Sequence, residues 1–150
     1  MSGNPGANPG TPPRPAVGGV LETALYVDDL DRASDFYCEI LGMEVMRPGR
    51  NIRPLSVAGR HVLLLCKKGG STRPRRLSGG VVPPHDGDGR LHLAFSIPTS
   101  DFEAWRTWLE HRDVPIESVV EWELGGRSLY FRDPDGHAVE LATPGTWPIY

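Results

Sequence analysis

Three ionisable residues stand at related places in the two halves of the chain: Glu22, His92 and Glu140. Each is expected on a strand, facing away from that strand's aliphatic side chains, because residues two apart share a face. An unpaired buried carboxylate is costly, so Glu140 has to be solvated, paired or bound to a cation. The alternatives are a solvated outer face for Glu140 and a satisfied core imidazole for His92. Carboxylates and imidazoles are accepted ligands of divalent metals, and we therefore predict a metal site of these three residues.

The strands that carry them belong to an order of elements, β-α-β-β-β, that occurs twice. An aspartate-rich segment, 28–31, caps a first helix that Gly42 ends, and Thr99 or Ser100 caps a second. Alternation of apolar residues predicts the strands of the first half at 20–27, 43–47, 53–58 and 61–66. The predicted strands of the second half are 90–97, 116–124, 128–132 and 137–142. An internal repeat of this kind indicates two similar modules.

The turn 133–136, with the sequence DPDG, connects the last two strands of the second half. Pro134 presets φ at the second turn position, and Gly136 relaxes the exit from the turn. When Gly136–Glu140 is aligned with Gly59–Leu63, the residue that matches Glu140 in the first half is Leu63. A fourth ligand is therefore not expected. Three protein ligands leave positions open for water and substrate, as in catalytic rather than structural sites.

Bulk properties exclude several classes of function. The 150 residues suffice for one domain, and the net charge of −3 argues against nucleic acid as the main partner. The longest apolar runs are too short to cross a membrane, and no signal peptide is visible, so a cytoplasmic protein is expected. Cys38 and Cys66 lack metal-like spacing and are expected to be free thiols.

The sequence divides into five segments. Residues 1–18 are rich in Pro and Gly with almost nothing to bury, which predicts a disordered tail. A single domain is expected over 19–143, and residues 144–150 form a C-terminal segment. Within the domain we predict a first module at 19–66, a linker at 67–89 and a second module at 90–143.

Three stretches carry a resemblance to a known family: LETALYVDDLDRASDFYCEILGMEV (21–45), LHLAFSI (91–97) and LYFRDPDGHAVEL (129–141). With the module order, they resemble the vicinal oxygen chelate superfamily, which includes glyoxalase I, extradiol dioxygenases, fosfomycin-resistance enzymes and bleomycin-binding proteins. The resemblance implies an α+β fold in which two tandem βαβββ modules form a cupped, barrel-like mixed sheet. It implies metal positions at Glu22, Leu63, His92 and Glu140, of which Leu63 cannot bind an ion. Glu22 departs from the commoner histidine.

The resemblance implies a metal-dependent lyase or dioxygenase whose small organic substrate chelates one divalent ion through vicinal oxygens. The ion would be Fe, Mn, Ni, Co or Zn. Glu22 could double as a proton shuttle, and His85 and Tyr130 are candidates for acid–base or orienting roles. The alternative is a metal-free drug- or metabolite-binding protein of the bleomycin-resistance type.

A homodimer is expected, because one module cannot close a cavity alone and the partner module can come from a second chain. The linker allows pairing within a chain or across chains at similar entropic cost.

Overall fold

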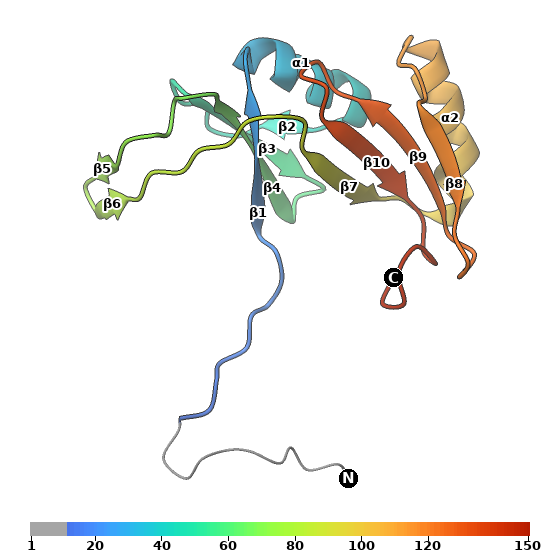
Figure 1. Ribbon diagram of the computed structural model, residues 1–150, viewed down its shortest axis with the longest axis horizontal. Coiled ribbons are helices and arrows are strands. Elements are labelled where there is room, and N and C mark those ends of the chain that lie inside the picture. The colour runs from blue at the N-terminus through green and yellow to red at the C-terminus, as the bar shows by residue number, and fades with distance from the viewer. Residues whose placement is uncertain (1–11) are drawn as a thin grey trace.

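The computed structural model describes residues 12–150, so most of the predicted tail lies outside the described residues. The described residues form two four-stranded sheets, two α-helices, one 3₁₀ turn and one small hairpin (Figure 1). The first module contains β1 (Glu22–Val27), α1 (Leu30–Leu41), β2 (Glu44–Val45), β3 (Ile52–Val57) and β4 (His61–Lys67). The second contains β7 (His92–Ser96), η1 (Thr99–Asp101), α2 (Phe102–His111), β8 (Ser118–Glu121), β9 (Arg127–Arg132) and β10 (Ala138–Ala142). The α+β class and the repeat are confirmed.

The two sheets have the same topology. Their strand orders are β1-β4-β3-β2 and β7-β10-β9-β8, and in each the first and last strands of the module pair in parallel. The other pairs are antiparallel, so both sheets are mixed. No helix of the described residues is long and apolar enough to span a membrane.

The first helix has the predicted ends. The Asp29 side chain accepts hydrogen bonds from the backbone N–H groups of Asp31 and Arg32, both at 3.0 Å. Gly42 has a left-handed φ of 69°, which glycine adopts without steric cost. The second helix differs, because Thr99 and Ser100 belong to the 3₁₀ turn η1 and make no capping bond to the backbone. The Ser100 hydroxyl instead donates to Asp101 at 3.0 Å.

One face of each sheet is buried against the helices. In the first module Leu25, Val27, Leu63 and Leu65 are at most 2 % exposed, and in the second Leu129, Phe131, Val139 and Leu141 are at most 1 % exposed. These residues belong to one continuous apolar core. Burial of this face leaves the opposite faces of the sheets available for a site.

The DPDG turn connects the modules as well as two strands. Gly136 has a φ of 82°, and its N–H donates to the Asp133 carbonyl at 3.0 Å, as the turn prediction requires. The buried Tyr37 hydroxyl donates to Asp133 at 2.9 Å, and the Asp28 N–H donates to Asp135 at 2.8 Å. Both donors belong to the first module, so the turn is an inter-module contact.

The linker contains two strands that were not predicted, β5 (Arg75–Leu77) and β6 (Gly80–Val82). They pair only with each other in a two-stranded sheet that extends away from the body (Figure 1). We call residues 71–85 the arm. Its base is closed by the His85 N–H, which donates to the Ser71 carbonyl at 3.0 Å.

Candidate functional site

His92 and Glu140 form the centre of the candidate site. They lie on the neighbouring parallel strands β7 and β10, where His92 is opposite Ala138 and Glu140 is opposite Ala94. Paired residues share a face, and residues two apart on a strand share it too, so both side chains project from the same side of the sheet. The Nε2 atom of His92 lies 3.3 Å from Oε2 of Glu140. Two of the three predicted ligands therefore lie side by side.

The hydrogen bond of His92 Nδ1 determines whether Nε2 faces Glu140 as a donor or as an acceptor. Nδ1 lies 3.0 Å from the Ala138 carbonyl oxygen, which can only accept, so Nδ1–H is the donor. Nε2 of the neutral ring then directs a lone pair towards the carboxylate of Glu140. Two acceptors at 3.3 Å repel each other unless a proton or another cation lies between them. A histidine oriented by a carbonyl in this way is typical of metal sites.

Glu140 is buried and accepts hydrogen bonds from neutral groups. It is 5 % exposed, and its Oε1 accepts from the Ser128 hydroxyl at 2.5 Å. Trp122 Nε1–H donates to that serine oxygen at 2.8 Å. Among the residues that the structure describes, no Lys or Arg forms an ion pair with Glu140. The neutral Ser128 hydroxyl offsets little of the cost of burying the negative charge, so the Glu140 carboxylate is suited to bind a cation.

Tyr130 completes this cluster. It lies opposite Glu140 on β9, and its ring stacks with the His92 ring at a centroid distance of 6.2 Å. Burial, followed by the hydrogen bond to Glu140, raises the pKa of Tyr130 to about 12. The hydroxyl is therefore protonated at neutral pH and serves as a donor, not a base. Of the two candidates for acid–base or orienting roles, His85 and Tyr130, it is Tyr130 that lies beside His92 and Glu140.

Glu22 lies apart from His92 and Glu140 in the single chain. It lines a cavity of about 460 Å³ between the start of β1 and residues 93–96 of β7, which follow His92. Over residues 12–150, no three His, Cys, Asp or Glu side chains are grouped closely enough to hold a metal ion. Convergence of the three predicted ligands within one chain is thus not observed. The reason is tertiary, because β1 and β7 are edge strands of separate sheets.

The fourth ligand position was assigned to the wrong residue. Glu22 pairs with Val62 as His92 pairs with Ala138, so the first-module equivalent of Glu140 lies two residues after Val62. That residue is Leu64, whereas Leu63 faces the helix side and is 1 % exposed. The error arose because the glycines of the two turns, Gly59 and Gly136, were taken as equivalent. Leucine offers no donor atom, so the expectation of no fourth ligand is unaffected.

His85, the third predicted catalytic residue, lies at the base of the arm. Its Nδ1 is 2.8 Å from the Tyr26 hydroxyl, and burial raises the pKa of that tyrosine. The described hydrogen bonds and ion pairs of His85 do not include His92 or Glu140. His85 instead pairs with Tyr26 of β1, separately from His92 and Glu140.

Sequence reasoning did not single out His137, which has a structural role between the modules. Its ring is fully buried; Nδ1 accepts from the Leu91 N–H at 2.9 Å and Nε2 is 2.9 Å from the Tyr26 carbonyl. The first contact requires a lone pair and the second a proton, so the ring is neutral with the proton on Nε2. His137 thereby joins β1 of the first module to the residue that precedes His92. Ser128 and Trp122 were missed as well. Ser128 lies two residues before Tyr130, the residue opposite Glu140, and Trp122 reaches Ser128 from the connection between β8 and β9.

Comparisons with known proteins extend these observations. The model of the Glyoxalase/Bleomycin resistance protein/Dioxygenase superfamily matches residues 19–141. A metallothiol transferase FosB of Staphylococcus epidermidis is 30 % identical over 119 residues, covering 78 % of this chain and 75 % of the relative. A glutathione transferase FosA of Serratia marcescens is 33 % identical over 117 residues, covering 78 % and 74 %. The crystal structure of a lactoylglutathione lyase from Agrobacterium tumefaciens has 31 % identity and a TM-score of 0.80, covering 88 % of this chain and 98 % of the other.

Proposed function

Since this chain belongs to the Glyoxalase/Bleomycin resistance protein/Dioxygenase superfamily, we propose that it is a divalent-metal-dependent enzyme acting on a small organic substrate. His92 and Glu140 of one chain and Glu22 of the partner subunit would hold the ion. The substrate would bind through two neighbouring oxygens. The relatives FosB and FosA and the lactoylglutathione lyase support an enzymatic function of this kind.

The observation that carries the proposal is the contact between His92 Nε2 and Glu140 Oε2 at 3.3 Å. The Ala138 carbonyl holds the imidazole with its free nitrogen directed at the carboxylate, and Ser128 holds the other carboxylate oxygen. The donor set, one imidazole nitrogen and carboxylate oxygens, fits Fe, Mn, Ni, Co or Zn. The His92 side chain is 54 % exposed, so an ion and a substrate can approach it from solvent.

The roles of the protein groups follow from their protonation and exposure. A bound divalent ion supplies Lewis-acid polarisation of the substrate oxygens. The Tyr130 hydroxyl, protonated at neutral pH, would act as a donor beside Glu140, which Tyr130 faces from β9. Glu22 is exposed on β1 and is the candidate proton shuttle. His85, bonded to Tyr26, is the more distant acid–base candidate.

Thiol chemistry is the second candidate, and the names of three relatives favour it. Lactoylglutathione is a thioester of a thiol cofactor, and the other two relatives are transferases named for thiols. Incubation of metal-loaded protein with glutathione and a small electrophile would consume free thiol if this candidate holds. Oxygen uptake without thiol consumption would favour a dioxygenase.

A metal titration distinguishes a metal-dependent enzyme from a metal-free binding protein. Protein that is stripped with chelator, dialysed free of it and titrated calorimetrically with Mn²⁺, Co²⁺ and Zn²⁺ is expected to bind one ion per chain. Glu140→Gln keeps the size of the side chain but removes its charge, and affinity should fall by about 100-fold or more. Glu39→Gln is the matched control, since Glu39 is an exposed carboxylate of α1 that pairs with Arg112 at 2.9 Å. Protein that binds no metal after soaking would favour the binding protein of the bleomycin-resistance type.

A further inference from the structure

The arm (residues 71–85) has little of its own chain to pack against. Its strands β5 and β6 form three residue pairs, and the two strands make a separate sheet. An isolated two-stranded hairpin is marginally stable in water. Figure 1 shows it extending from one end of the molecule, beyond the first sheet. A hairpin in this position gains stability from a surface that it contacts.

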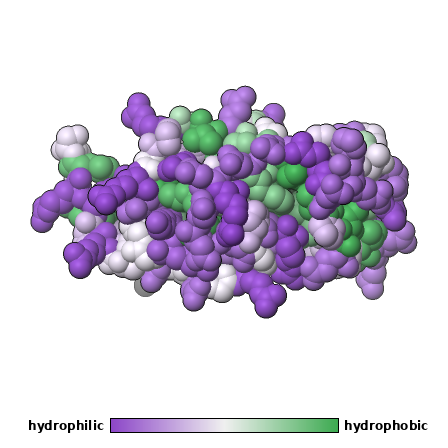
Figure 2. All heavy atoms as spheres, turned by 90° about the horizontal axis from the view of Figure 1, so that it is seen from above, coloured by the Kyte–Doolittle hydropathy of each residue, from purple (hydrophilic) through white to green (hydrophobic). Residues whose placement is uncertain are grey.

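The chemistry of the arm indicates which kind of surface. Arg73, Arg75 and Arg76 are exposed, and the arm contains no acidic residue. None of these three arginines forms an ion pair with another residue of the described range. Leu77 and Val81 are each 53 % exposed, and Figure 2 shows green and purple spheres together at this end. The arm therefore offers positive charge beside apolar side chains.

A surface of opposite charge lies along β8. Residues 113–124, which we call the acceptor surface, contain no basic residue and four acidic ones: Asp113, Glu117, Glu121 and Glu123. They also expose Val119 (40 %), Trp122 (37 %) and Leu124 (61 %). The whole chain carries −3, so without the three arm arginines the remainder carries −6. The negative charge of the acceptor surface is opposite to the positive charge of the arm, and both surfaces expose apolar side chains that can pack together.

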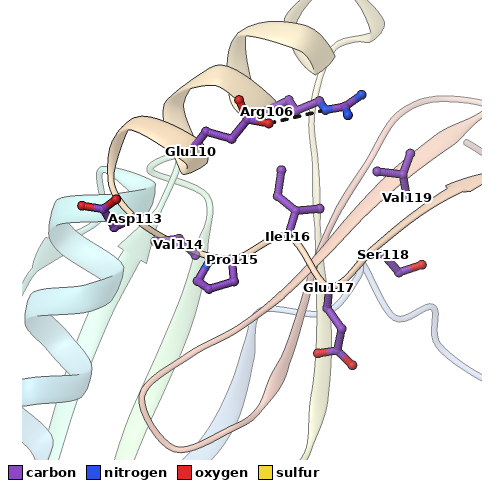
Figure 3. A pocket seen from close by; sticks show the side chains of 9 residues that line it. All are labelled: Arg106, Glu110, Asp113, Val114, Pro115, Ile116, Glu117, Ser118 and Val119. Carbon is purple, nitrogen blue, oxygen red and sulfur yellow. Dashed lines mark ion pairs between the residues drawn. The ribbon is translucent and has the colours of Figure 1, made fainter.

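The acceptor surface has space for another chain and free backbone groups. A groove of about 620 Å³ separates α2 from the segment that leads into β8 (Figure 3). Ile116 points into this groove towards α2, where Arg106 and Glu110 pair at 3.8 Å. β8 is the last strand of its sheet. Among the strands of residues 12–150 it pairs only with β9, so its outer N–H and C=O groups have no strand partner there. An exposed strand edge is a template for strand addition.

The occupant is a second copy of this chain. The arm and β8 lie at opposite ends of the molecule, so one chain cannot fill its own acceptor surface (Figure 1). In a two-fold pair with opposed long axes, each arm reaches the other chain's β8, and both contacts form together. We propose that the arm docks along β8 of the partner subunit by strand addition and by arginine–glutamate pairing. The same symmetry places the first module of one chain beside the second module of the other. A metal site shared between the two chains needs this arrangement, and that link rests on the proposed function.

Charge reversal tests the contact. The arm variant is Arg75→Glu with Arg76→Glu, and the edge variant is Glu121→Lys with Glu123→Lys. Sedimentation equilibrium of the full chain should show a dimer, and each variant should weaken dimerisation by about tenfold or more. The chain carrying all four substitutions should regain dimerisation, because the charges of its arm and of its acceptor surface are again opposite. Arg47→Glu with Arg50→Glu, an equal charge change on exposed residues outside the arm, is the control and should leave the dimer unchanged.

The outcomes separate this proposal from the metal site. A monomer at micromolar concentration, or a dimer whose affinity neither variant changes, overturns the arm contact. Failure of the fourfold variant to recover would overturn the pairing of these two surfaces. The metal titration of Glu140→Gln is a separate measurement, because a chain can bind the ion weakly through two ligands without dimerising. Unsubstituted protein that binds no metal but still forms arm-dependent dimers would therefore reject the proposed function alone.

Discussion

Replacement of His137 by alanine is expected to destabilise the protein by about 3–5 kcal/mol. The imidazole is fully buried and holds the Leu91 N–H and the Tyr26 carbonyl, each at 2.9 Å. In the alanine variant both groups lose their partner in the protein interior. The contact between β1 and the start of β7 is then weakened where the two modules meet.

The magnitude follows from the two orphaned groups. Each buried backbone group without a partner costs about 1–3 kcal/mol, and the vacated ring volume adds a cavity cost. For a chain of this size each kcal/mol lowers Tm by about 2–4 °C, so a fall of about 10 °C is expected. Metal binding does not enter this figure, provided that the protein is stripped with chelator before the measurement.

Thermal and urea unfolding of three variants provide the assay. His137→Asn places an amide oxygen near the position of Nδ1 and should recover the bond from Leu91. His137→Gln reaches towards the position of Nε2 and should recover the bond to Tyr26. Each is expected to regain about half of the loss. His111→Ala, at an exposed position of α2, is the control and should change stability by less than about 1 kcal/mol. An alanine variant at position 137 that loses less than about 1 kcal/mol would refute this account of the inter-module contact.

Two further predictions concern Tyr130 and the N-terminal segment. Burial and Glu140 raise the pKa of Tyr130 from about 10 to about 12, so the unfolded chain releases this proton at lower pH than the folded chain. The free energy of unfolding should therefore fall as pH rises between about 10 and 12, and Tyr130→Phe should reduce that slope in urea titrations at alkaline pH; an identical slope would count against the contact with Glu140. Deletion of residues 2–18 should leave Tm nearly unchanged in calorimetry, because that segment has no core-forming pattern; a fall of several degrees would show that it packs on the protein.

Local signals in the sequence were sufficient for most elements. The Asp29 cap, the left-handed Gly42 and the DPDG turn are short-range features, and the structure has all three. The pairing of His92 with Glu140 was also predictable, because alternation assigned each side chain to the same face of its sheet. The hairpin β5–β6 was missed because three-residue strands carry too little alternation to be distinguished from a Gly/Pro-rich loop.

The remaining differences have non-local causes. One residue of error in aligning two turns moved the fourth position from Leu64 to Leu63, which reverses the face because the strand period is two. His137 finds its partner Tyr26 111 residues away, which no local pattern reveals. The separation of Glu22 from the pair depends on how the two modules pack, and short-range spacing contains no information about it.

Metal stoichiometry in a mixture of two variants tests the shared site most directly. Glu22→Ala and His92→Ala each break every site in their own homodimers. After full subunit exchange half of the dimers are mixed, and each mixed dimer has one intact site, so about one quarter of the wild-type sites should return. Calorimetric titration with Mn²⁺ measures this without knowledge of the substrate. The account predicts high-affinity binding of about 0.25 ion per chain in the mixture and none in either variant alone. Equally weak binding in the mixture and in the separate variants, with exchange confirmed by mass spectrometry, would contradict it.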